Sequence, residues 1–515
     1  MSTESICVLV AIIAYLVLTV CIGVYYSRKG SASDTTNFYL GGRALHPVVT
    51  AMSAEASDMS SYLLMGLPGL AYLCGVAEVG WTVIGLAIGT YLNFLFVAKK
   101  LRIYSAKIGA TTVPDFFAKR YEDERHVLSC IAALVILIFF VPYTASGFKA
   151  VGTLFNSLFG WNYHAAMIIG AAVIIGYTVL GGFLAVSTTD LIQSVVMTIA
   201  LLVVVVFGIT QAGGLDTVMS NAQSLPGYLG LTEGYDVATQ SAGSFGLLSI
   251  VSTLAWGLGY FGMPHILLRF MAIRNPQEIK ISRRIAAIWV VFSMAIAVFI
   301  GIIGYSVSLS GKIPMLSTSS ESETIIVQLA NLMSQNGVFF AIIAGVIMAG
   351  ILAATMSTAD SQLLAASSSM SEDILKEFFG INLDEKKSML IARITVIAVA
   401  VVGIILAWNP NSSVFRVVSF AWAGFGAAFG PAMLLALYWK KSTKAGAIAG
   451  MICGGAMIFI WKFGISSLGG VFGIYELLPA FIVALVANVI VSLLTKTPSD
   501  NMMNTFDEVG DYLKN

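Results

Sequence analysis

The sequence predicts an all-α polytopic membrane protein that folds as a single unit. Hydrophobic residues make up 58% of the 515 residues and charged residues only 11%, and the mean hydropathy is +0.88. Soluble domains carry about 25% charged residues, so this composition excludes the soluble enzyme classes. The net charge of +1 gives no field that would attract nucleic acid or an acidic partner.

Apolar runs long enough for a helix to cross ~30 Å of hydrocarbon occur thirteen times. They cover about 5–27, 46–72, 76–98, 127–148, 163–183, 188–212, 240–268, 285–307, 337–369, 389–408, 413–438, 443–461 and 472–495. The first run follows Glu4 instead of a basic segment, so we expect a retained span and not a signal peptide. The segment 99–126 is expected to hold a short surface helix.

The basic residues predict the direction of the chain across the membrane. Thirteen spans place the two termini on opposite faces. With the N-terminus outside, 24 of the 28 Lys and Arg residues fall in cytoplasmic segments, and the remaining four outside are Lys149, Lys312, Arg416 and Lys462. Because cytoplasmic loops carry the excess of basic residues, we expect an external N-terminus and a cytoplasmic C-terminus. No GxxxxGK[ST] motif is present, so transport would draw on a gradient and not on ATP.

The second span is polar at membrane depth. Between Ser53 and Tyr62 it contains Glu55, Asp58 and four serines, although an ionisable side chain costs roughly 2.5–3.5 kcal/mol at the bilayer centre. This pattern predicts a broken helix whose free carbonyls and hydroxyls line a cavity. The alternative is that Asp58 only caps a kink.

The ninth span presents small and hydroxyl-bearing residues on one helical face, namely Ala354, Ser357, Thr358 and Ser361. Such a row could serve only to pack helices together, but packing does not require the neighbouring Asp360. Hydroxyls that face the carbonyls of a broken helix supply the hard oxygen ligands that Na⁺ prefers. The span is therefore a candidate Na⁺ site.

Two further spans carry polar or helix-breaking residues. The sixth begins with Ser187 and Asp190, for which an N-cap is the simplest interpretation. The seventh contains three glycines between Trp256 and Pro264, which predicts a second broken helix with aromatic walls. The two broken spans are five helices apart, as an inverted repeat of five plus five helices requires. Five cysteines without CxxC spacing and four scattered histidines predict neither a disulfide framework nor a zinc site.

Several motifs give the chain a resemblance to the sodium/solute symporter family over nearly its whole length, and most of all to its bacterial sodium/proline symporters. The matching stretches are 39–43 (YLGGR), 56–60 (ASDMS), 63–69 (LLMGLPG), 181–187 (GGFLAVS), 256–262 (WGLGYFG), 356–358 (MST) and 421–431 (AWAGFGAAFGP). The resemblance implies a leucine-transporter-type core in the second to eleventh spans. The expected organisation is a first helix and cytoplasmic loop (1–45), two inverted repeats (46–212 and 213–438), and two peripheral helices with a short tail (439–515).

The resemblance also implies site residues. Na⁺ is expected at the backbone oxygens of Ala56, Met59 and Ala354 and the hydroxyls of Ser357 and Thr358. The solute is expected at Asp58, Ser60, Trp256, Tyr260 and Pro264, with Tyr143 as a gate. Asp190, Asp360 and Ser361 form a candidate site for a second cation, either Na⁺ or a proton, because two unpaired carboxylates in a membrane core are costly. The alternative is that Asp360 turns toward the cytoplasmic water path and stays solvated.

The function that follows is uptake of L-proline by alternating access, coupled to inward Na⁺ flow, in the inner membrane of a bacterium. The expected partners are proline, Na⁺ and the lipid bilayer, with no enzymatic activity and no obligate protein partner. The alternatives are Na⁺ symport of another small amino acid or carboxylate, and a transport-like sensor or channel. The chain departs from the usual proline carriers at Glu55, Ser61, Tyr62, Met263 and Asp360.

Overall fold

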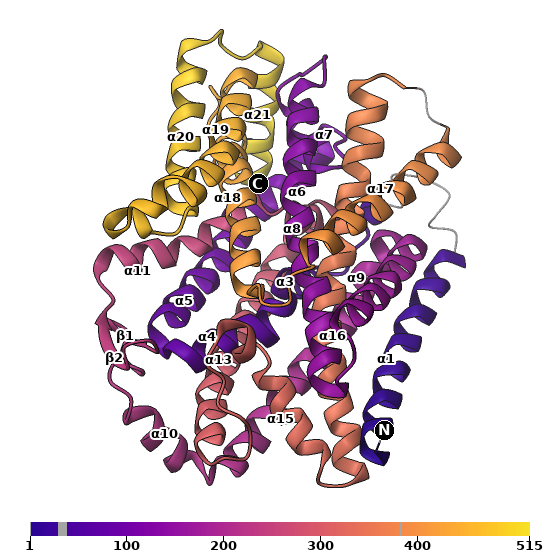
Figure 1. Ribbon diagram of the computed structural model, residues 1–515. Helices are drawn as coiled ribbons and strands as arrows, with labels where there is room; N and C mark the ends of the chain where they lie inside the picture. The colour runs from indigo at the N-terminus through magenta and orange to yellow at the C-terminus, as the bar shows by residue number, and fades with distance from the viewer. Residues whose placement is uncertain (1, 29–38, 382–383, 515) are drawn as a thin grey trace.

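The computed structural model describes residues 2–28, 39–381 and 384–514, which form a bundle of helices (Figure 1). In this part of the chain, ten helices are long and apolar enough to cross a membrane, or eleven if the bent pair Leu247–Gly262 and Pro264–Ala272 is one span. This confirms the all-α polytopic class. The total of thirteen stays a prediction, because 46–72 forms a broken helix and 163–183 yields only the shorter apolar helix Tyr163–Gly176. The loop containing Lys29 lies outside the described residues.

The first half of the chain runs from α1 to a small hairpin. Its elements are α1 (Thr3–Arg28), η1 (Gly41–Arg43), α3 (Pro47–Ser61), η2 (Tyr62–Gly66), α4 (Leu67–Cys74), α5 (Val76–Leu92), η3 (Asn93–Ala98), α6 (Lys99–Lys107), α7 (Val113–Arg120), α8 (Val127–Phe159), α9 (Tyr163–Ala212), α10 (Leu215–Gln223), β1 (Glu233–Asp236) and β2 (Ser241–Ser244). The antiparallel pair β1 and β2 is a small departure from the expected all-α structure.

The second half contains the other broken helix and the peripheral helices. Its elements are α11 (Leu247–Leu254), η4 (Ala255–Gly262), α12 (Pro264–Ala272), η5 (Pro276–Glu278), α13 (Ile279–Leu309), α14 (Ser319–Ser322), α15 (Ile325–Ser334), α16 (Val338–Ser368), η6 (Ser369–Phe378), α17 (Glu385–Leu406), α18 (Val414–Tyr438), α19 (Lys444–Phe463), η7 (Ile465–Leu468), η8 (Gly470–Gly473), α20 (Leu477–Leu494) and α21 (Asp500–Lys514).

Both predicted helix breaks are present. In α3, Ser60 has φ +47° and ψ −168°, and the chain continues as the π-helical turn η2. In the seventh span, the tight 3-10 turns of η4 end at Met263, and α12 leaves at an angle of 47°. Close backbone contact fixes η4 in place, because a Cβ on Gly257 would lie 2.2 Å from the carbonyl oxygen of Gly85 on α5. The prediction of two broken helices is therefore confirmed.

A third break lies close to the boundary expected between the fifth and sixth spans, which sequence analysis placed between residues 183 and 188. Gly182 has φ +64° and ψ −178° inside α9, and the apolar helix that follows begins at this glycine and not at residue 188. Ser187 and Asp190 consequently lie inside a helix, and both are buried. Their interpretation as N-cap residues is wrong.

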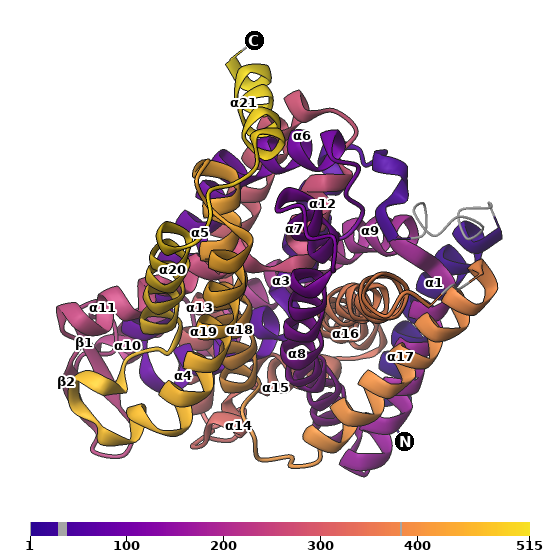
Figure 2. The same ribbon diagram turned by 90° about the horizontal axis from the view of Figure 1, so that it is seen from above.

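The broken α3 lies at the centre of the bundle. It packs against α9, α13 and α16, while η4 packs against α5 and α18; Figure 2 shows α3 enclosed by these helices. Helix α7 forms in the segment where a surface helix was expected, but nearly all of its residues are buried. The side chains of Phe116 and Phe117 anchor α7 in the core instead of leaving it on the surface.

Candidate functional site

Backbone and hydroxyl oxygens meet where α3 approaches α16. The hydroxyl of Ser357 lies 2.8 Å from the carbonyl oxygen of Ala56 and 3.1 Å from that of Ala354, and the hydroxyl of Thr358 lies 3.2 Å from the latter. All four residues are buried. The fifth expected ligand, the carbonyl oxygen of Met59, accepts a hydrogen bond from the N–H of Tyr62 beside the break. This set of neutral, hard oxygens has the chemistry that suits Na⁺.

Asp58, two residues after Ala56 on α3, is held by hydrogen bonds from α8 and η4. The hydroxyl of Tyr143 on α8 donates to the Asp58 carbonyl oxygen at 2.9 Å, and the hydroxyl of Tyr260 on η4 donates to Asp58 Oδ2 at 2.6 Å. The hydroxyl of Ser60 accepts from the N–H of Tyr62 at 3.1 Å. The structure therefore gathers the polar residues expected to bind solute around the break in α3.

An aromatic wall stands beside these polar groups. The ring of Trp256 lies 5.6 Å from that of Tyr62, 5.5 Å from that of Phe415 and 5.0 Å from that of Tyr475, measured between centroids. The indole N–H of Trp422 donates to the Trp256 carbonyl oxygen at 2.8 Å. Such contacts hold flat apolar surfaces in fixed positions. Pro264 is also buried and begins α12 at the bend.

Three of the sequence departures lie near the same pocket. Glu55 is 1% exposed, and within the described part of the chain neither of its carboxyl oxygens has a hydrogen-bond partner. Tyr62 contributes its ring to the aromatic wall, stacked at 5.5 Å on Phe415. Met263 is fully buried at the bend between η4 and α12. Glu55 lies near Asp58, Tyr62 lies against Trp256, and Met263 directly precedes Pro264, so these side chains can alter which solute fits.

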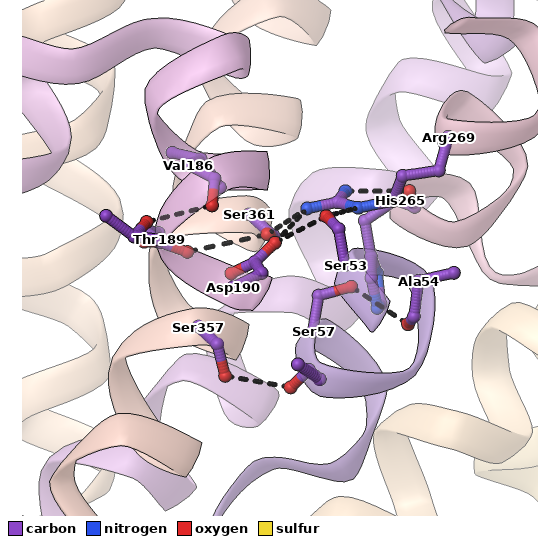
Figure 3. A network of polar contacts seen from close by, with 12 residues as sticks. Ser53, Ala54, Ser57, Val186, Thr189, Asp190, His265, Arg269, Ser357 and Ser361 are labelled. Atoms are coloured by element: carbon purple, nitrogen blue, oxygen red, sulfur yellow. Dashed lines mark hydrogen bonds and ion pairs between the residues drawn. The ribbon is translucent and has the colours of Figure 1, made fainter. Parts of the chain in front are cut away.

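A positively charged side chain, Arg269, lies where two unpaired carboxylates were expected from the sequence (Figure 3). The guanidinium of Arg269 forms a 3.0 Å ion pair with Asp190 Oδ2. It also donates to the hydroxyls of Ser53 at 2.8 Å and Ser361 at 2.6 Å. The hydroxyl of Ser53 in turn donates to Asp190 Oδ2 at 2.6 Å. The premise that Asp190 is unpaired is wrong, because Arg269 supplies its counter-charge.

Asp360 keeps one free oxygen. Its Oδ1 lies 3.4 Å from the hydroxyl of Ser361, and no described residue forms a hydrogen bond to its Oδ2. Asp360 is fully buried. Arg269 was missed because the seventh apolar run ends one residue before it, so this arginine was counted with the cytoplasmic loop. Its position four residues after His265, on the helix that Pro264 begins, was the available signal.

Another buried acidic residue, Glu323, lies beside the aromatic wall at the N-terminus of α18. The Glu323 carboxylate accepts hydrogen bonds from the N–H groups of Val414 and Phe415 at 3.0 and 3.1 Å and from the hydroxyl of Ser413 at 2.7 Å. Lys149 on α8 pairs with it at 3.7 Å. Glu323 therefore satisfies the exposed amides at the N-terminus of α18, the helix that also carries Trp422.

Two solved transporters share the fold. A Na⁺-coupled sialic acid symporter in a substrate-bound, outward-open state has a TM-score of 0.77 at 18% identity, covering 96% of this chain and 99% of that chain. The nucleobase-cation-symport-1 family transporter MHP1, closed with bromovinylhydantoin bound, has a TM-score of 0.53 at 15% identity, covering 92% and 99%. These similarities support the leucine-transporter-type fold class and, at such low identity, concern the fold alone.

Relatives of higher identity match the full length. The high-affinity proline transporter PutP of Bacillus subtilis is 41% identical, covering 95% of this chain and 98% of that protein. Sodium/proline symporter 2 of Staphylococcus saprophyticus is 39% identical, covering 98% and 96%. The osmoregulated proline transporter OpuE of B. subtilis is 38% identical, covering 99% of each. The model of the sodium:solute symporter family matches residues 38–454. The chain belongs to the sodium:solute symporter family.

Proposed function

We propose that the protein is a secondary active transporter that couples inward Na⁺ flow to uptake of L-proline. The observation that carries this proposal is that one broken helix, α3, contributes to both the oxygen cluster and the polar site around Asp58. Ala56, at the oxygen cluster with Ser357, lies two residues before Asp58, at the hydroxyls of Tyr143 and Tyr260. Relatives named as proline transporters, at 38–41% identity over nearly the full length, support the choice of ions and solute.

Coupling follows from this arrangement. Na⁺ at Ala56, Met59, Ala354, Ser357 and Thr358 holds the unwound part of α3 against α16. The same segment presents Asp58 and Ser60 to the solute, so the ion reduces the entropy lost when the solute binds. By linkage, bound solute raises the affinity for Na⁺ by the same factor. The core then changes from outward-facing to inward-facing with both bound.

The solute contacts divide between polar and apolar groups. Asp58 and the hydroxyl of Tyr260 are suited to the secondary ammonium of proline, while Trp256 and Tyr260 offer flat surfaces to its pyrrolidine ring. Tyr143, whose hydroxyl reaches the Asp58 carbonyl oxygen, acts as a gate beside the pocket. Proline has little polar surface, so the shape of the aromatic wall carries much of the selectivity.

For the second cation, we propose Asp360 as the main ligand, because Asp190 already has a partner. With Arg269 paired to Asp190, this buried cluster has two carboxyl groups and one guanidinium. The free Oδ2 of Asp360 and the neighbouring hydroxyl of Ser361 remain as ligands for one additional cation during transport. In the membrane, the excess of basic residues in alternate loops supports an external N-terminus and a cytoplasmic C-terminus.

The test is uptake of radiolabelled proline by proteoliposomes containing the purified protein. We expect accumulation that requires an inward Na⁺ gradient, and counterflow of labelled against unlabelled proline when both sides contain equal Na⁺. A channel would show flux without counterflow. A panel of unlabelled amino acids and carboxylates, tested as competitors, identifies the solute if the Glu55, Tyr62 and Met263 departures have changed it.

A further inference from the structure

A polar cavity of about 510 Å³ is lined on one side by the aromatic wall. Its lining comes from α5, α11, η4, α18, the end of α19 and the segment between α19 and α20, and it includes Trp256, Phe415 and Tyr475. Figure 2 shows α11, the β1–β2 hairpin and the segment after α19 together on one side of the bundle. Volumes of 300–1,000 Å³ are usual for small-molecule sites, so this cavity can hold a small amino acid with its hydration water.

The cavity carries two cations and two anions in facing pairs. Arg416 lies 3.7 Å from Glu78, and Lys462 lies 3.3 Å from Glu476, measured between the charged nitrogen and oxygen atoms. Arg416 on α18 faces Glu78 on α5, and Lys462 on α19 faces Glu476 directly before α20. All four side chains line the same cavity. The lining therefore has no net charge but offers a partner of each sign.

The floor of the cavity leads to the proposed solute site. Trp256 and Phe415 line the cavity, and Tyr62 lies behind them in ring contact with both. Tyr475 covers Trp256 at 5.0 Å with an angle of 21° between the rings. It is fixed by its hydroxyl, which donates to the Ser419 carbonyl oxygen at 2.7 Å, and by its N–H, which donates to the Ser252 hydroxyl at 2.7 Å.

We propose that this cavity is an outer binding site that captures the zwitterionic solute before it passes Trp256 to reach Asp58. The solute carboxylate replaces an acidic side chain as partner of Lys462 or Arg416, and its ammonium replaces a basic side chain as partner of Glu476 or Glu78. A zwitterion can make both exchanges at once, whereas an ion of one sign leaves an acidic or basic side chain without its partner. This inference rests on the proposed function, because it takes the transported amino acid as the ligand.

The location agrees with capture from outside the cell. Arg416 and Lys462 are two of the four basic residues that the proposed orientation puts on the external side. Lys312 is another of the four, but its ammonium donates to the carbonyl and side-chain oxygens of Gln211 at 2.7 and 3.1 Å and does not line the cavity. Replacing Lys312 is therefore a matched control, because it removes one positive charge from the same side of the membrane without changing the cavity.

The kinetic test compares Lys462→Gln, Arg416→Gln and the control Lys312→Gln in proteoliposomes. Charged groups at the edge of a binding surface act mainly on the rate of capture, so we expect each cavity variant to raise KM for proline about 3- to 10-fold with kcat and the Na⁺ requirement unchanged. The control should retain the KM of the unmodified protein. An unchanged KM in both cavity variants, or an equal rise in the control, overturns the proposal.

A binding measurement separates capture from damage to the central site. In Tyr260→Ala, the central site is weakened, and purified protein in saturating Na⁺ should retain weak binding of radiolabelled proline. Adding Glu476→Gln should remove that remaining binding, and its persistence would overturn the outer site. Absence of Na⁺-dependent proline uptake by the unmodified protein would instead contradict the proposed function itself.

Discussion

The guanidinium of Arg269 on α12 forms a 3.0 Å ion pair with Asp190 on α9, and both side chains are buried. The hydroxyl of Ser53 on α3 lies between them and hydrogen-bonds to each. The two residues therefore join the helix after the second break to the helix after Gly182, with α3 in between. Movement of α12 relative to α9 during transport would have to break or carry this pair.

We predict that Arg269→Gln destabilises the protein and impairs transport. Removing one partner of a buried pair leaves the other charge without compensation, which costs about 3–5 kcal/mol. The double variant Arg269→Gln with Asp190→Asn removes both charges, and it should regain a large part of the lost stability. Thermal unfolding of the purified protein in detergent measures both effects.

The control for this prediction is Arg274→Gln, because Arg274 forms an exposed pair with Glu278 one turn away. It should unfold at nearly the same temperature as the unmodified protein. Equal unfolding temperatures for Arg269→Gln and Arg274→Gln would mean that the buried pair contributes nothing.

Replacing both Ser357 and Thr358 by alanine should greatly raise the Na⁺ concentration required for uptake. Two of the five proposed ion ligands are lost, while alanine preserves the helix. Uptake measured against Na⁺ concentration tests this. The matched control is the Ser367→Ala and Ser368→Ala pair on the same helix, whose hydroxyls donate to carbonyl oxygens of the preceding turn, at Leu364 and Ala365. An unchanged Na⁺ requirement in the first double variant, with normal membrane insertion, would place the ion elsewhere.

Tyr260→Ala should weaken the apparent affinity for proline and leave the apparent Na⁺ affinity, measured without proline, little changed. Tyr260→Phe retains the ring but loses the 2.6 Å hydrogen bond to Asp58, so it should lose less affinity than the alanine variant. Tyr121→Phe is the control, because its hydroxyl contacts Ser442 away from the pocket. If Tyr260→Ala transports with the concentration dependence of the unmodified protein, the solute pocket lies elsewhere.

The helix breaks that sequence analysis found have strong local signals. Pro264 removes a backbone donor, and the serines and acidic residues around Asp58 are costly in a continuous apolar helix. The break at Gly182 was placed a few residues too late, between 183 and 188, because the polar run from Ser187 to Asp190 was interpreted as the start of the sixth helix. A glycine in a helix is compatible with packing as well as with a break, and only the backbone angle of φ +64° distinguishes them.

The charged pairs could not be predicted because they depend on distant packing. Arg269 and Asp190 are 79 residues apart in the sequence. Arg269 is the first of five basic residues between 269 and 284, and it is buried in the bundle. Counting charges assigns such a residue to the loop. Tyr475 was missed for a similar reason, since its contact with Trp256 joins a peripheral segment to the core.

Asp360 should determine how many charges move with each solute. Arg269 neutralises only one of the two carboxyl groups in its cluster, and the free Oδ2 of Asp360 is buried. We therefore expect two positive charges per proline in the unmodified protein and one in Asp360→Ser. One Na⁺ driven by 100 mV contributes ~2.3 kcal/mol, and a tenfold gradient adds ~1.4 kcal/mol, which together support roughly 500-fold accumulation. A second cation would square that limit.

Reversal potentials in proteoliposomes, measured over a range of Na⁺ and proline gradients, give the number of charges directly. The control is Asp384→Ser, because Asp384 is an exposed N-cap of α17 and serine can accept the same hydrogen bond from the N–H of Lys387. It should keep the ratio of the unmodified protein. One charge per proline in all three proteins would show that Asp360 holds no transported cation, and that Arg269 alone balances the charge of this cluster.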